Sequence, residues 1–161
     1  MIRKHKKYSN PRKRYDSVRI SEENALVERY ALKNKREIWK FEAKVRYFRN
    51  RAKALITARP EEQQALFKKL VAIGLPIQSV SDVLALTKED LLKRRLTSVL
   101  AQRGLARTPR EARQMISHKR VRIHGKAVSA PGYLVKTHDE NAIQVKQPVL
   151  PIKQEEEPIH E

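Results

Sequence analysis

The spacing of the apolar residues changes once along this chain of 161 residues, and the change limits the folds open to it. Over residues 21–118 apolar residues recur at steps of three and four, the spacing that predicts helices with one buried face. After residue 118 the step becomes two, since Val121 and Ile123 are separated by the charged Arg122. Alternation of this kind predicts a half-buried strand. We therefore expect an α+β fold in which a long helical part precedes a small sheet.

Capping signals predict where the helices of the first part begin. The expected starts are Ser21, the stretch after Asn34, the stretch after Arg59-Pro60, Ser79 and Thr87. The helix that begins at Thr87 is predicted to continue without a break to Arg103. Gly104 then ends it, because glycine readily adopts the left-handed conformation found just past a helix.

Residues 91–150 carry the signals of a compact module. Its second helix is predicted to open at Thr108-Pro109-Arg110-Glu111, where an N-cap, a proline at the first helical position and the Glu of a capping box coincide. Strands are expected at 121–124, from Val128 after a Gly125-Lys126 turn, at 133–135 and at 142–145, with a loop at 138–141. These signals predict two short helices packed at an angle on a small, strongly bent antiparallel sheet.

Positive charge is concentrated in two blocks of the sequence. The chain has 36 Lys and Arg against 18 Asp and Glu, a net charge of +18. Residues 1–60 contain 19 basic and 6 acidic residues, and residues 91–126 contain 11 basic and 1 acidic residue. The segments 61–90 and 127–161 are both slightly acidic. Dense basic blocks separated by an acidic spacer indicate a nucleic-acid partner rather than an evenly solvated surface.

Several classes of protein are not expected from this composition. The absence of Cys excludes disulfides, thiol catalysis and cysteine-containing zinc sites. No apolar run is long enough for a membrane helix, and the charged residues 3–7 do not fit a secretory signal. No glycine precedes Gly74, so a nucleotide-binding glycine loop is not expected before the module. The pair His118 and His124 is too weak a signal for a metal site. We therefore predict no cofactor, no metal, no membrane partner and no small-molecule substrate.

Several runs of the module resemble the ribosomal protein S-four family. They are Leu92-Lys93-Arg94-Arg95-Leu96, residues 103–109 and Ala112-Arg113-Gln114-Met115-Ile116, followed by His118, Val121, Gly125, Val128, Pro131 and Tyr133. Outside the module, residues 30–40 are similar to the YGLRNKRELW signature of the archaeal and eukaryotic branch. The resemblance covers most of residues 8–150. It implies a primary binder of small-subunit ribosomal RNA that holds a multi-helix junction early in assembly.

The resemblance and the charge blocks together predict four segments. Residues 1–20 are expected to form a basic extended arm and residues 21–90 a helical RNA-binding domain with scaffold helices. Residues 91–150 form the compact RNA-binding module, and residues 151–161 an acidic flexible tail. Bacterial members of the family carry a cysteine cluster for zinc, and its absence here means that no zinc site is implied.

The predicted site consists of RNA-contacting residues and contains no catalytic residue. Arg95, Arg110 and Arg113 are expected to make bidentate contacts with phosphates, and Gln114 and His118 to hydrogen-bond nearby. The other predicted contacts in the module are Arg94, Arg103, Arg107, Thr108, Lys119, Arg120, Arg122 and Lys126. Those in the first part of the chain are Arg12, Arg14, Lys33, Lys35, Arg36, Trp39, Lys40 and Lys44. Because Trp39 lies off the apolar stripe of its helix, both an exposed contact and a packing anchor remain open for it.

Three alternatives compete with this prediction. An RNA-modification protein, or an accessory to one, would need a catalytic domain, and the residues before the module show no sign of it. A helix-turn-helix DNA binder is disfavoured because Pro109 and Glu111 stand where base-contacting side chains belong. A nucleolar or other ribosome-assembly factor would carry the same module and leave before the particle matures. We predict a cytoplasmic constituent of the small ribosomal subunit whose partners are small-subunit ribosomal RNA and neighbouring ribosomal proteins.

Overall fold

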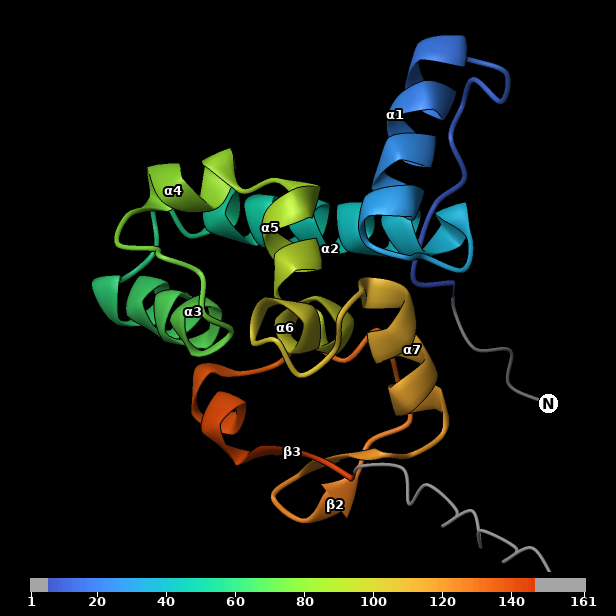
Figure 1. The fold of residues 1–161 in the computed structure, drawn as a ribbon. Coiled ribbons are helices and arrows are strands. Elements are labelled where there is room, and N and C mark those ends of the chain that lie inside the picture. The colour runs from blue at the N-terminus through green and yellow to red at the C-terminus, as the bar shows by residue number, and fades with distance from the viewer. Residues whose placement is uncertain (1–5, 147–161) are drawn as a thin grey trace, which may run out of the picture.

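Helices form most of the chain up to residue 117, and a small sheet follows them (Figure 1). The computed structural model describes residues 6–146. Its helices are α1 (Ser17–Arg29), α2 (Lys35–Ala54), α3 (Pro60–Ala72), α4 (Val80–Ala85), α5 (Lys88–Lys93), α6 (Leu96–Gln102) and α7 (Pro109–Ser117). The remaining elements are β1 (Val121–Ile123), β2 (Lys126–Ala127), the 3-10 helix η1 (Thr137–Ala142) and β3 (Ile143–Val145). The order confirms the predicted α+β class. The predicted acidic tail and the first five residues of the predicted arm lie outside the described residues.

Helix α1 begins before its predicted start at Ser21. Its N-cap is Asp16, whose carboxylate accepts a hydrogen bond from the backbone N–H of Arg19 at 3.4 Å. Asp is as good an N-cap as Ser, so the first of the two available caps begins the helix. The earlier start places Glu23 in the middle of α1, where it is buried, and not in the first turn.

The other predicted helix starts in the first part are confirmed. Asn34 is the N-cap residue of α2, and α3 begins at Pro60. Ser79 and Thr87 each form a complete capping box with the Asp that follows three residues later. Two free N–H groups are satisfied in each box, which explains why helices of only six residues form at these points.

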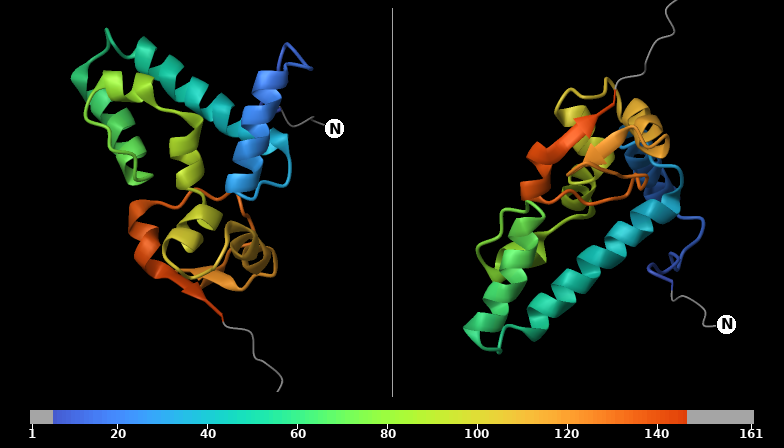
Figure 2. Two further views of the ribbon diagram at one scale, coloured as in Figure 1. Left: turned by 45° about the horizontal axis from the view of Figure 1, so that its top comes forward. Right: turned by 90° about the horizontal axis from the view of Figure 1, so that it is seen from below.

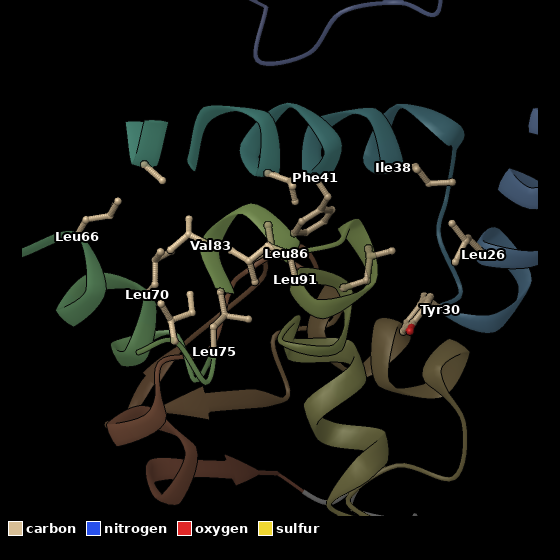
Figure 3. Close-up of a cluster of buried hydrophobic side chains, with 14 of the residues drawn as sticks. Leu26, Tyr30, Ile38, Phe41, Leu66, Leu70, Leu75, Val83, Leu86 and Leu91 are labelled. Carbon is tan, nitrogen blue, oxygen red and sulfur yellow. The ribbon is translucent and has the colours of Figure 1, made fainter. Parts of the chain in front are cut away.

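The first part of the chain is built around one apolar cluster (Figure 3). Helices α1 to α5 all contribute to it, with Leu26, Ile38, Phe41, Leu70, Val83 and Leu91 among its buried members. Phe48 packs against the same cluster, so the aromatic residues of the α2 stripe serve the core as predicted. This packing makes α2 a rigid support whose other faces carry charged residues.

The predicted single helix from Thr87 to Arg103 is wrong. Helix α5 ends at Lys93 and α6 begins at Leu96. Between them the backbone pairs with a distant segment: the N–H of Leu96 donates to the carbonyl of Tyr133 at 2.8 Å, and the N–H of Val135 donates to the carbonyl of Arg94 at 3.0 Å. A tertiary strand contact thus replaces two helical hydrogen bonds, and no local residue signals it.

The sheet contains three short antiparallel strands in the order β2-β1-β3. The β1–β2 turn is His124-Gly125, one residue earlier than predicted, and both residues have positive φ values of 49° and 75°. The predicted strand at 133–135 forms only an isolated bridge between Arg95 and Leu134. The predicted loop at 138–141 is part of η1. The module is therefore bent more by turns and bridges than by long strands.

A second apolar cluster lies in the module. It begins at Leu96, whereas the first cluster ends at Leu92, so the break between α5 and α6 separates the two cores. In both views of Figure 2 the segments from α6 to β3 gather on one side of the helical part. Within residues 6–146 no helix has the length and apolarity needed to cross a bilayer.

Candidate nucleic-acid interface

A groove with a volume of about 890 Å³ lies between α2 and the module. Lysines, aromatic rings and a turn of the module line it: Lys7, Glu37, Lys40, Phe41, Ala43, Lys44, Tyr47, Arg113, Pro131 and Gly132. Although much of Lys44 is exposed, partial desolvation, and then the charges of Lys7 and Lys40, lower the pKa of its ammonium group. An anion in the groove would relieve this crowding of like charges. The groove is thus suited to a phosphate backbone.

A second groove, of about 540 Å³, lies between α1 and the start of α7. Its lining consists of Asn24, Val27, Glu28, Ala31, Leu32, Lys33, Arg110 and Arg113. Lys33 and Arg110 are exposed and come from the two halves of the molecule. Arg113 lines both grooves, so they form one surface, which we call the junction surface. It is defined by Lys7, Lys33, Lys40, Lys44, Arg110 and Arg113.

Helix α7 presents one polar face beside the junction surface. Its N-cap Thr108 accepts a hydrogen bond from the N–H of Glu111 at 3.2 Å, as predicted. The Glu111 carboxylate accepts from the N–H of Arg107 at 2.7 Å, so it satisfies the residue before the cap. Ala112 and Ile116 are fully buried in the second cluster. Burial of this stripe leaves the other predicted contact residues of the helix and its flanks exposed: Arg107, Arg110, Gln114 and His118.

The turn and hairpin after α7 expose four more predicted cations, Lys119, Arg120, Arg122 and Lys126. Lys119 has a φ of 57°, a left-handed conformation that turns the chain out of the helix. In β1, Val121 and Ile123 are buried and Arg122 between them is exposed. The strand alternation predicted from the sequence is confirmed, and it places these charges on the solvent side of the hairpin.

The described part of the arm folds back against α1 instead of extending from it. The guanidinium of Arg19 donates to the backbone carbonyls of Lys13 and Arg14 at 3.1 and 2.9 Å. Arg12 and Arg14 keep exposed side chains, as does Arg36 of α2. These three predicted contact residues are thus available at the surface.

Arg95 is not available for the bidentate phosphate contact that the sequence suggested. Its side chain is fully buried, with 0% of its surface exposed. One guanidinium nitrogen donates to Glu37 at 2.6 Å, and the group lies 5.7 Å from the centre of the Phe41 ring. Burial lowers the pKa of Arg95 and the attraction of Glu37 opposes that change, so the guanidinium stays charged. Arg95 is a structural residue.

Glu37 joins the helical part to the module. It accepts hydrogen bonds from Arg113 at 2.9 Å, from Arg95, and from the backbone N–H of Lys33 at 3.3 Å. Arg113 also donates to the carbonyl of Ala31 at 3.1 Å. Burial raises the pKa of Glu37, but hydrogen bonding by Arg113 and the charges of both arginines outweigh it, and the net pKa is lowered. Arg113 therefore spends part of its hydrogen-bonding capacity within the protein.

Arg94 and Arg103 are tied to η1. Arg94 donates to the carbonyl of Ile73 at 2.6 Å and to that of Val135 at 3.2 Å, and pairs with the Glu140 carboxylate. Arg103 donates to the same carboxylate at 3.2 Å. Arg94 is largely buried by these contacts, and its predicted role in RNA contact does not fit this position.

Trp39 is a packing anchor. Its indole N–H donates to the buried Glu23 of α1 at 2.9 Å, and its ring lies 6.0 Å from that of Tyr8. Lys35 pairs with the same carboxylate at 3.7 Å. Burial raises the pKa of Glu23, and the hydrogen bonds from Trp39 and Arg19 more than offset this and lower it. Of the two interpretations left open for Trp39, the structure favours the second.

Asp139 gathers side chains that the sequence analysis treated separately. It is buried and accepts hydrogen bonds from Tyr133 at 3.0 Å and from His124 at 3.0 Å. Tyr133 is therefore a packing residue, as expected. Burial raises the pKa of Asp139, but hydrogen bonds from His124 and Tyr133 and the charge of His138 outweigh it and the pKa is lowered. His124 lies with His138 and not with His118.

Three acidic residues that organise the module escaped the sequence analysis: Glu37, Glu140 and Asp139. Their arginine and histidine partners lie 58, 46 and 15 positions away in the chain. Helical or strand periodicity carries no information about contacts at such separations. A single acidic residue surrounded by basic sequence was the only available signal.

Comparison with known proteins gives a consistent result. The S4 domain family matches residues 94–141. The chain is 44% identical to small ribosomal subunit protein uS4 of Methanothermobacter thermautotrophicus, over 86% of this chain and 84% of the relative. It is 42% identical to the uS4 protein of Hyperthermus butylicus and 39% identical to that of Saccharolobus islandicus, again over 86% of this chain, and over 82% and 80% of these relatives. At this identity, over nearly the full length of both partners, the chain belongs to the uS4 family of small ribosomal subunit proteins.

Proposed function

We propose that this chain is a structural constituent of the small ribosomal subunit that binds small-subunit ribosomal RNA and fixes a multi-helix junction during assembly. It acts by binding, without catalysis, in the cytoplasm. Neighbouring small-subunit proteins are its other partners. Membership of the uS4 family and the basic surface together support this function.

The observation that carries the proposal is the junction surface. Its exposed cations come from α2 and the α1–α2 connection on one side and from α7 on the other. The Glu37 contacts hold these two sides in one arrangement. A protein that presents phosphate-binding groups from two rigidly joined parts can hold two RNA helices at a fixed angle.

Recognition is expected to depend on RNA backbone shape. The major groove of an RNA duplex is too deep and narrow for side chains to read bases, so contacts fall on phosphates and 2′-hydroxyls. The start of α7 also suits phosphates better than bases, because Thr108 and Glu111 are occupied with capping. Arg107, Arg110, Gln114 and His118 remain as the exposed contact groups of this helix.

The proposal is tested by RNA binding at several salt concentrations. The variant Lys40→Ala/Lys44→Ala/Arg110→Ala removes three exposed cations of the junction surface. The matched control, Arg59→Ala/Lys68→Ala/Lys69→Ala, removes three exposed cations around α3. Each lost phosphate contact should flatten the log–log salt slope by about 0.7 to 0.9, so the first variant should lose about 2 to 3 units and the control none. Equal losses in both variants would contradict the site.

A second measurement separates a ribosome constituent from an assembly factor. A constituent should co-sediment with mature small subunits, whereas an assembly factor should be found only with immature particles. Competition with duplex DNA at fixed salt tests the helix-turn-helix alternative, which requires DNA to compete as well as junction RNA.

A further inference from the structure

We propose that His124, His138 and Asp139 form a binding site for one divalent transition-metal ion of the zinc class. The site lies in the module, where the β1–β2 turn meets η1. It is separate from the junction surface and does not depend on RNA binding.

Three ligand atoms converge at this point. The Nε2 atom of His124 lies 3.0 Å, and the Nε2 atom of His138 2.9 Å, from the same Oδ1 atom of Asp139. All three ligand atoms lie within 4.8 Å of one another. At zinc–ligand distances of 2.0 to 2.2 Å, neighbouring ligands of a tetrahedral ion are about 3.4 Å apart. Shifts of a few tenths of an ångström would therefore admit the ion.

The carboxylate is held in place by groups other than the histidines. Asp139 is only 5% exposed, and its second oxygen, Oδ2, accepts a hydrogen bond from the Tyr133 hydroxyl at 3.0 Å. Oδ1 is thereby turned toward the two imidazoles. A ligand oriented by an outer hydrogen bond of this kind is typical of metal sites in proteins.

The histidines arrive from different elements. His124 lies in the β1–β2 turn and His138 in η1, and their rings are 6.2 Å apart between centroids, with an angle of 30° between the planes. Their side chains are 57% and 65% exposed, so an ion can enter and retain open coordination positions for water. Bound metal would connect the hairpin turn to η1 and reduce the motion of both.

The donor set selects the class of ion. Two imidazole nitrogens and one carboxylate oxygen suit zinc, cobalt, nickel or copper, whereas magnesium and calcium prefer oxygen ligands only. Magnesium should therefore not compete at concentrations that leave a zinc site fully occupied. The sequence analysis predicted no metal site because His124 and His138 are 14 positions apart and no spacing rule joins them.

Calorimetric titration of the full, metal-free chain with zinc chloride tests the site. We expect one zinc ion per chain, a rise in melting temperature that a chelator reverses, and no effect of magnesium. His124→Ala and His138→Ala should each weaken zinc binding at least about tenfold. His118→Ala is the matched control, an exposed histidine of the same module, and should leave zinc affinity unchanged.

Two further measurements make the test independent of folding. Circular dichroism of each variant should match that of the unaltered chain, because both histidines are exposed. Cobalt should give a visible absorption band that His138→Ala abolishes and His118→Ala retains. The proposal is overturned if zinc does not bind with one-to-one stoichiometry. It is equally overturned if His124→Ala and His138→Ala bind zinc as tightly as the unaltered chain, or if His118→Ala weakens binding as much as they do.

Discussion

Arg95 and Arg110 belong to the same basic block, yet they occupy opposite environments. Arg95, in the break between α5 and α6, is fully buried beside Glu37 and Phe41. Arg110, near the start of α7, is exposed in the groove beside Lys33. The difference shows that a count of positive charges combines two populations. One stabilises the contact between the two cores, and the other is free to meet phosphate.

The largest effect should come from removing the charge that compensates Arg95. Glu37→Gln leaves a buried guanidinium without its carboxylate, and two of its nitrogens, Nε and Nη1, already have no hydrogen-bond partner in the described part of the chain. We expect the free energy of unfolding to fall by about 3 kcal/mol. Urea denaturation measures it. Glu42→Gln, an exposed carboxylate on the same helix, should change it by less than about 0.5 kcal/mol.

The second prediction concerns Arg94, the other structural arginine of this break. A Cβ atom on Gly74 would lie 2.5 Å from the Arg94 guanidinium carbon, and Gly74 has a φ of 85°. Gly74→Ala should therefore cost about 2 kcal/mol of stability, through backbone strain and displacement of Arg94. In Gly132→Ala the added atom meets no neighbour within 4 Å, so its stability should be nearly unchanged. Similar losses in the two variants would show that Arg94 is not held tightly.

The third prediction separates the two populations by RNA binding. Arg110→Ala should weaken RNA binding about tenfold, equivalent to about 1.4 kcal/mol, and flatten the salt slope by about 0.7 to 0.9, without loss of stability. Arg95→Met, studied where it remains folded, should leave the salt slope unchanged because Arg95 meets no phosphate. A reduced slope for Arg95→Met would remove the distinction between these arginines.

The smallest effect is a pH dependence of stability. The pKa of Glu37 is lower in the folded chain than its ordinary value of 4.5. Its stabilising contribution is therefore complete above that ordinary value and is lost as the pH falls through the lowered, folded pKa. The stability difference between the unaltered chain and Glu37→Gln should shrink below about pH 4.5. A constant difference down to pH 3 in urea titrations would contradict the role of the Glu37 charge.

Local signals accounted for much of the fold. Ser79 and Thr87 capped their helices as predicted because a capping box involves only residues three apart. The alternation around Arg122 placed that residue on the exposed face of β1. The predicted helix across residues 94 and 95 failed because the pairing segment around Leu134 lies about 40 positions away and competes for the same backbone groups.

The candidate site was predictable in type and only partly in detail. Exposed Arg107, Arg110 and Gln114 follow from the apolar stripe of α7, which buries the opposite face. Arg94, Arg95 and Trp39 were assigned to the surface because their sequence neighbours are charged. Their partners, Glu140, Glu37 and Glu23, are brought to them only by folding.

The sequence by itself determined the α+β class, most helix starts, the family and the need for a polyanionic partner. These properties depend on composition, on spacing over three or four residues, or on motifs read directly along the chain. Only the tertiary structure decided which arginines are structural, how the two cores are joined through Glu37, and that His124, His138 and Asp139 meet. The physical reason is that ion pairs and metal ligands depend on distance in space, and a chain brings distant residues together without marking them locally.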